Sequence, residues 1–243
     1  MLSMPADSEL AVALVSAIQR GDVDALQAQL RQHPELAAAR VIDGRGVSRT
    51  LLHVAADWPG HFPNAAVTVA ILATAGADVN ATAVTPKSAE TALHWAASSD
   101  DVAVLDALLD AGADIEAPGA VFTGGTPMSD AVVFGQWRAA RRLLERGATT
   151  TIWQAAALGL VDRVRAFCST EPPPSREQIT NALWHACHGA QQAAAEFLLD
   201  QGADLNWIGY DHKTPFDLTL ESRDDNLINR LRARGARRAS ELP

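Results

Sequence analysis

Two short strings recur in a fixed order along this chain of 243 residues. The first string is Thr-x-x-His-x-Ala-Ala, and its full or weakened copies begin at Thr50, Thr91, Thr126 and Thr214. The second is Gly-Ala-Asp, which follows at 76–78, 112–114 and 202–204. The step from Thr91 to Thr126 is 35 residues. Repetition at such a period predicts a repeat protein, in which each unit packs only against its neighbours.

The residues of each copy predict two helices and a loop. Threonine at the start of the first string is a good N-cap, and Pro127 and Pro215 stand at the first helical position, where no donor is lost. Spaced apolar residues over 102–109 predict a second helix, and Gly112 follows it at the position of a C-cap glycine. Alanine pairs such as Ala96-Ala97 allow neighbouring helices to stack closely.

These strings resemble the ankyrin repeat, whose signature is T-P-L-H-x-A with a period of 33 residues. The resemblance covers roughly residues 8–237. It implies an all-α fold, an ankyrin-repeat solenoid of about seven helix-turn-helix units with projecting hairpin loops, in a single domain over 1–243. The expected helical pairs are about 8–39, 50–80, 91–116, 126–149, 150–169, 181–206 and 214–237.

The pattern is broken in three places. Residues 57–64 lengthen the link between the two helices of the second pair by about five residues. The fifth pair, a degenerate copy that we align from Thr150, follows Gly147 with almost no hairpin. The proline-rich segment 170–175 replaces the usual Gly-Ala-Asp and predicts a stiff connector before the degenerate copy at Asn181.

Charge and composition exclude several classes of function. The formal net charge is −9, although the last fourteen residues hold five arginines and one glutamate. An acidic body disfavours nucleic acid and anionic membrane surfaces. Only two cysteines occur, and no apolar run approaches the length of a membrane span. We therefore expect a cytoplasmic monomer that binds neither nucleic acid nor membrane, and the scarcity of lysine beside abundant arginine hints at a bacterial source.

Most of the reactive side chains have a structural explanation. His53 and His94 belong to the signature, where the imidazole normally ties neighbouring loops together, and Trp153 and Trp184, which we align with them, predict apolar filling instead. His185 and His188 share a helix face beside Cys187, but two ligands do not make a metal site. No nucleophile elbow, P-loop or dinucleotide fingerprint is present. We therefore predict no metal, no cofactor and no enzymatic activity.

The position after the signature histidine is expected to face a concave surface. It holds Val54, Trp95, Asp130, Gln154, His185 and Leu218. With the residues that follow the alanine pairs, this gives the candidate partner-binding residues Asp57, Trp58, His61, Trp95, Ser98, Asp130, Phe134, Gln154, His185 and His188. Aromatic side chains gathered on one face favour a binding site, although the 57–64 loop could equally cover them.

The resemblance implies a non-catalytic protein-binding module that uses the concave face and the hairpin tips, with another protein as its partner. Outer-helix positions such as Asp106 are expected to matter little for binding. The alternative is a small-molecule-binding or enzymatic pocket that the 57–64 loop would form over Trp95 and Asp130. In that case Asp57, His61 and Asp130 would supply the acid and base groups.

Overall fold

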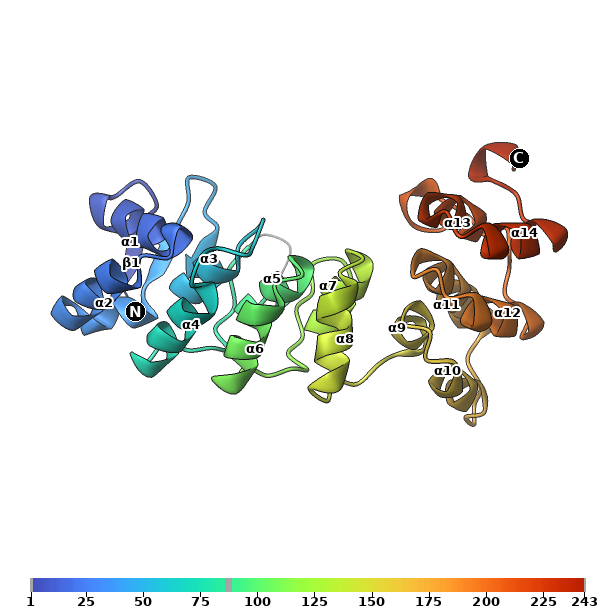
Figure 1. Ribbon diagram of the computed structural model, residues 1–243, viewed down its shortest axis with the longest axis horizontal. Coiled ribbons are helices and arrows are strands. Elements are labelled where there is room, and N and C mark those ends of the chain that lie inside the picture. Colours follow the sequence, from blue (N-terminus) through green and yellow to red (C-terminus); the bar gives the residue numbers. More distant parts are fainter. Residues whose placement is uncertain (1, 86–88, 243) are drawn as a thin grey trace. The chain divides into compact units, whose positions relative to one another are not determined.

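A computed structural model describes residues 2–85 and 89–242. Over these residues it contains fourteen α-helices, which follow one another as seven antiparallel pairs (Figure 1). The chain divides into two compact units, Met1–Ala148 and Thr149–Pro243. The all-α repeat fold expected from the sequence is confirmed, and each unit is described in turn.

The first unit holds four helical pairs in two layers. The inner layer consists of α1 (Glu9–Arg20), α3 (Leu51–Ala56), α5 (Ala92–Ser98) and α7 (Pro127–Val133). The outer layer consists of α2 (Val23–Gln32), α4 (Ala65–Thr74), α6 (Val102–Asp110) and α8 (Trp137–Glu145). Each helix packs on the next helix of its own layer as well as on its pair partner. The side of the unit that carries the inner layer is called the inner-helix side below.

The core of the first unit lies between these two layers. It is built from fully buried leucines of both layers together with the alanine pairs of the inner helices, such as Ala55-Ala56 and Ala96-Ala97. Thr50 caps α3 as the sequence predicts, and Asp22 and Asp101 accept hydrogen bonds from the first turns of α2 and α6. Small residues let the inner helices stack side by side.

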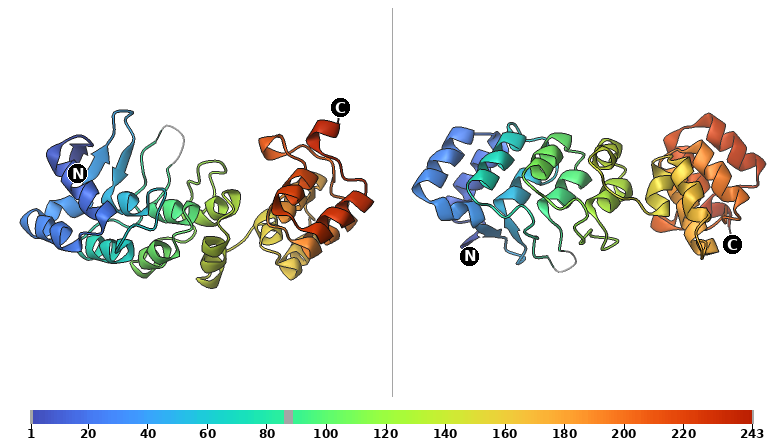
Figure 2. Two further views of the ribbon diagram at one scale, coloured as in Figure 1. Left: turned by 45° about the horizontal axis from the view of Figure 1, so that its top comes forward. Right: turned by 90° about the horizontal axis from the view of Figure 1, so that it is seen from below.

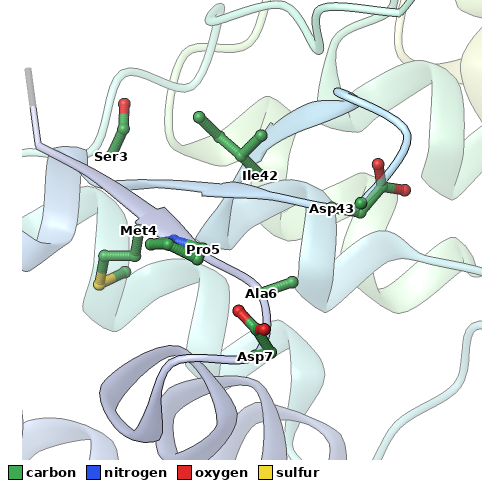
Figure 3. Close-up of a pocket in the computed structure, with 8 residues that line it drawn as sticks. Ser3, Met4, Pro5, Ala6, Asp7, Ile42 and Asp43 are labelled. Carbon is green, nitrogen blue, oxygen red and sulfur yellow. The ribbon is translucent and has the colours of Figure 1, made fainter.

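A three-stranded sheet stands at the start of the first unit. Strand β2 (Arg40–Ile42) pairs antiparallel with β3 (Ser48–Thr50), and β1 (Ser3–Pro5) adds to β2 in parallel. The β2–β3 hairpin projects from the helical layers (Figure 2). An open pocket of about 500 Å³ lies between β1 and the hairpin tip (Figure 3). The short hairpin was expected, but the N-terminal strand was not.

The second unit holds three helical pairs. They are α9 (Ile152–Ala157) with α10 (Val161–Cys168), α11 (Arg176–His188) with α12 (Gln192–Asp200), and α13 (Pro215–Ser222) with α14 (Asp225–Ala233). Short 3₁₀ turns complete the chain: η1 (Pro34–Ala38) in the first unit, and η2 (Tyr210–His212) and η3 (Ala239–Glu241) in the second. A core of leucine, alanine and aromatic side chains runs through all three pairs.

Two details of the second unit differ from the sequence alignment. Helix α9 is capped by Thr151, not Thr150, so Gln154 takes the place of the signature histidine and Trp153 does not. Helix α11 begins at Arg176, five residues before Asn181, because Ser175 and Gln178 form a complete capping box there. The aligned position of Trp153 was therefore wrong by one residue.

No helix within the described residues is long and apolar enough to cross a membrane.

Candidate protein-binding surface

The signature histidines tie each repeat to the next. The ring Nδ1 of His94 accepts a hydrogen bond from the backbone of Thr91 at 3.1 Å, and its Nε2 lies 3.3 Å from the carbonyl oxygen of Gly125. His53 makes the equivalent contacts to Thr50 and to the carbonyl of Glu90. Because Nδ1 accepts, the proton is on Nε2, which donates to the carbonyl. Both histidines thus have the structural role expected of them.

Burial keeps these rings neutral. The pKa of His53 is lowered to about 4, chiefly because its buried ring cannot hold a charge without solvent. Burial also lowers the pKa of His94. Neutral, hydrogen-bonded imidazoles of this kind are fixed parts of the repeat, so they do not belong to a reactive site.

Trp184 replaces the histidine in α11 without losing its hydrogen bond. Its indole Nε1 donates to the carbonyl of Lys213 at 3.0 Å. Lys213 directly precedes the capping residue Thr214, just as Glu90 precedes Thr91. The expectation that Trp184 only fills apolar space is therefore wrong, because its N–H group makes the same bridge to the next repeat.

Residues 57–64 form a loop that is fastened at both ends. The carboxylate of Asp57 is ion-paired with Arg49. The backbone of His61 donates to Asp101 at 2.6 Å, and the Asn64 side chain donates to the carbonyl of Gly21 at 2.9 Å. The loop therefore packs on the turns of the first and third pairs, which holds its backbone in one place.

This fastened loop presents Trp58 to solvent. Trp58 is 80% exposed. Trp95, one of the aromatic residues that the 57–64 loop could have covered, is half-buried. The ring of Trp95 meets the ring of His53 edge-on, with centroids 4.9 Å apart. The side chain of Ser98, also half-buried, donates to the carbonyl of Trp95. Trp95 is thus partly a packing residue.

Asp130 does not lie on the surface. It is 1% exposed, and the loop 117–126 that precedes α7 covers it. Burial first, and then the neighbouring carboxyl of Glu90, raise the pKa of Asp130 to about 8. The expected surface exposure of this residue is wrong. Pockets of about 500 and 550 Å³ lie at β1 and between α2 and α4, away from the 57–64 loop.

An exposed aromatic pair adjoins Asp130. Phe134, at the end of α7, is 44% exposed, and Phe122, in the loop 117–126, is 71% exposed. Their ring centroids are 5.7 Å apart. The sequence predicted Phe134 as a candidate binding residue but not Phe122. Nothing in the sequence of the loop 117–126 indicates that this loop folds back along α7.

Trp58 and Phe134 have the same spacing from the start of their repeats, although Trp58 lies in the inserted loop and Phe134 caps the end of α7. Each stands eight residues after its capping threonine, Thr50 or Thr126. Trp95 belongs to the repeat between them. These aromatic groups come from three consecutive repeats, and packed helices are about 10 Å apart. We call Trp58, Trp95, Phe122 and Phe134 the aromatic surface.

The remaining candidates lie in the second unit and are mostly buried. Gln154 and His185 are 3% and 4% exposed, so their predicted place on a surface is wrong. His185 packs against Trp153 and Trp184, with ring centroids 4.5 and 5.0 Å apart. Burial lowers its pKa to about 4. His188 is half-buried and stacks on Trp184, and Tyr210 closes the cluster from the following loop.

The same burial applies to the two aliphatic residues aligned with these positions, Val54 and Leu218. Within the described residues, no group of three or more histidine, cysteine, aspartate or glutamate side chains is arranged to hold a metal ion. Cys187 is fully buried, and burial raises the pKa of its thiol to about 12. A thiol of that kind is inert as a nucleophile.

Stacked helix pairs, capped by threonine and joined by histidine bridges, define a helical repeat protein. Residues 14–119 and 68–152 match the family described as ankyrin repeats (3 copies), and the chain belongs to the ankyrin-repeat family. Ankyrin repeats generally serve as protein-interaction modules.

Two individual proteins are similar to parts or all of the chain. An ankyrin repeat and KH domain-containing protein of Caenorhabditis briggsae is 33% identical over 157 residues, which is 61% of this chain and 6% of that protein. The crystal structure of the human ASB11 ankyrin repeat domain matches with a TM-score of 0.53 at 23% identity, over 92% of this chain and 98% of that one. The second likeness concerns the fold alone.

Proposed function

We propose that this chain is a non-catalytic protein-binding module and that its partner contacts the aromatic surface of the first unit. The observation that carries the proposal is the exposure of Trp58 and Phe122, at 80% and 71%, on backbone that is fastened to neighbouring repeats. Large exposed aromatic groups at fixed positions are the usual anchors of protein interfaces. Because they are already held in place, little conformational entropy is lost on binding.

The charged candidates support a recognition role more than a chemical one. Asp57 is neutralised by Arg49, and Asp130 is covered by a loop. Acid–base catalysis requires such groups to converge on a substrate-sized space. Asp57 and Asp130 are instead occupied in separate structural contacts, which supports a non-catalytic binding module over an enzymatic pocket at the 57–64 loop. In this proposal the aromatic contacts are therefore the main source of affinity.

We further propose that the seven pairs act together as one cytoplasmic, monomeric domain over 1–243, with a protein as the partner. Neighbouring repeats joined by side-chain bridges would unfold cooperatively. A single calorimetric transition that is independent of protein concentration is expected. Two separate transitions would contradict the single-domain part of this proposal.

The binding proposal is tested by site-specific crosslinking. A photoreactive amino acid replaces Trp58 in one variant and Val67, which is exposed on the outer helix α4, in a matched control. A protein crosslinked in the native cell from position 58 but not from position 67 is then purified, and its affinity is measured.

Trp58→Ala should weaken that affinity about 30-fold, the effect of a hot spot worth about 2 kcal/mol. Val67→Ala should leave it unchanged. If the purified partner binds Trp58→Ala and Phe134→Ala as tightly as the parent, the aromatic surface is not its site.

A further inference from the structure

A second set of exposed aromatic and apolar side chains lies in the second unit, on the loop 204–213 before α13. Tyr210 is 53% exposed and Ile208 is 41% exposed, while Trp207 is half-buried. The core beneath them is already filled by the large side chain of Trp184, which is 6% exposed. Packing of the unit therefore does not account for the exposed side chains.

Hydrogen bonds and close packing fix the backbone of this loop. The amide of Gly209 donates to the carbonyl of Lys213 at 2.9 Å, and the indole of Trp184 donates to the same carbonyl at 3.0 Å. A Cβ on Gly209 would lie 2.5 Å from the ring of Trp207 and 2.8 Å from that of Trp184. Only glycine fits between these two rings, so the loop is held against α11 and its side chains project from a fixed position.

The ring of Tyr210 stands at right angles to two indoles. Its centroid is 5.1 Å from that of Trp184, with 83° between the ring planes, and 5.9 Å from that of Trp207, with 88° between the planes. Because Trp184 is buried, Tyr210 and Trp207 form the exposed part of this arrangement, which we call the aromatic corner. Ring faces carry partial negative charge, and a cation within about 6 Å of a ring centroid is attracted to it. A cation placed in the corner can therefore contact both rings.

A carboxylate stands directly beside the aromatic corner. Asp211 follows Tyr210 in the chain and is exposed. Among the described residues its side chain has neither a hydrogen bond nor an ion pair. The ammonium of Lys213 feels the charge of Asp211 but is held by Glu221 at 2.8 Å. Asp211 therefore remains available to a cation from outside the chain.

We propose that the aromatic corner and Asp211 bind a cationic side chain, arginine or lysine, of a polypeptide partner. The ring faces attract the charged group, Asp211 pairs with it, and the exposed Ile208 contacts the methylene stem of the bound side chain. Both rings are already oriented, so little ordering is needed for binding. This surface belongs to the second unit, and the proposal does not rest on the aromatic surface of the first.

The chain contains a single tyrosine, which provides the assay. With ring-labelled tyrosine in the full chain, the NMR signals of Tyr210 report on the corner without further assignment. The probe is a blocked Gly-Gly-Arg-Gly-Gly peptide, and its control replaces arginine by citrulline, which has a similar shape but no charge. The arginine peptide should shift the Tyr210 signals to saturation, with an affinity that falls as salt is added. The citrulline peptide should bind at least about fivefold more weakly.

Variants that retain Tyr210 are read by the same signals. Trp207→Leu removes one ring of the corner, and Asp211→Asn removes the carboxylate at an exposed position. Each should weaken binding of the arginine peptide about two- to fivefold, and Asp211→Asn should also reduce the salt dependence. Trp58→Leu, in the first unit, should leave the binding unchanged, so failure of this proposal can be distinguished from failure of the aromatic surface.

The proposal is wrong if the citrulline peptide binds as tightly as the arginine peptide, or if Trp207→Leu and Asp211→Asn both bind like the parent. It is also wrong if Trp58→Leu weakens binding to the same extent, because the peptide would then be attracted to the acidic chain without a defined site. Tighter binding of choline than of the arginine peptide would assign the corner to a small-molecule cation instead of a polypeptide.

Discussion

His94→Ala is expected to destabilise the chain strongly, because His94 serves two neighbouring repeats at once. Its removal leaves the buried backbone N–H of Thr91 without an acceptor, which costs about 1–3 kcal/mol. The hydrogen bond to Gly125 contributes about 1 kcal/mol more, although that carbonyl still accepts from Ala120. The lost ring also leaves a cavity at a fully buried position, at a cost on the order of 1 kcal/mol.

The total is about 3–5 kcal/mol. For a chain of 243 residues, each 1 kcal/mol lowers the melting temperature by about 2–4 °C. Circular dichroism during urea and thermal denaturation would therefore detect the change easily. A drop of roughly 6–20 °C is expected from these values.

The chain itself supplies the matched control for this variant. In α9, Gln154 stands at the histidine position, and its Oε1 accepts a hydrogen bond from the backbone of Thr151 at 2.7 Å. His94→Gln should therefore restore the acceptor for Thr91 and recover about 1–3 kcal/mol relative to His94→Ala. If His94→Ala melts with the parent, or if the glutamine variant is no more stable than the alanine variant, the bridging argument is refuted.

Two other predictions concern buried rings. The free energy of unfolding should fall between pH 6.5 and pH 4, because the unfolded chain takes up protons that folded His53 and His185 do not, at up to about 3 kcal/mol for each. The pKa of Asp130 is raised in the folded chain, so this residue stabilises the fold as the pH falls and offsets part of the loss. In Asp130→Asn the free energy of unfolding should therefore fall more steeply with decreasing pH. A urea midpoint that stays constant over this pH range in both chains would contradict both statements. Trp184→Phe should cost about 1 kcal/mol or more through loss of the N–H bond to Lys213, and a thermal melt identical to the parent would contradict that role.

Local chemistry explains how far the sequence alone could predict the fold. A capping threonine, an alanine pair and a glycine at the helix end each act on the few residues next to them, and so the helical pairs of the first unit were predictable. The register of α9 was not, because Thr150 and Thr151 are adjacent and equally able to cap. Only the acceptor three residues later, Gln154, distinguishes them, and glutamine does not belong to the signature.

Contacts between distant residues explain what was missed. Strand β1 has no strand-like pattern of its own and depends on pairing with β2, more than thirty residues away. Asp130 was expected on a surface because the position after the signature histidine was taken to face solvent, but Val54 and Leu218 at that position are buried as well, by packing between neighbouring repeats that the sequence of one repeat does not show. That Trp58 lies in a loop between α3 and α4 could be predicted, because the insertion, with its two prolines, is visible in the sequence.

The outer helices show why a mutation chosen as silent from sequence can be a poor control. Asp106 of α6 was expected to matter little for binding, but its carboxylate accepts hydrogen bonds from Arg142 at 2.8 Å and from Arg146 at 2.7 Å, both on α8. Asp106→Arg would place a third cation beside these two and replace attraction with repulsion between adjacent repeats.

Asp106→Arg should therefore lower the melting temperature, and the loss should shrink at high salt, because screening weakens the repulsion between partly exposed charges. Ala103→Arg changes the same helix at an exposed position that has no such partners among the described residues, and it should melt with the parent. Equal melting temperatures for the two variants at low salt would mean that the ion pairs between α6 and α8 do not hold these repeats together. If Asp106→Arg is destabilised and Ala103→Arg is not, Ala103 is the appropriate control position on the outer helices. Effects of substitutions in the aromatic surface on binding can then be compared with that of Ala103→Arg.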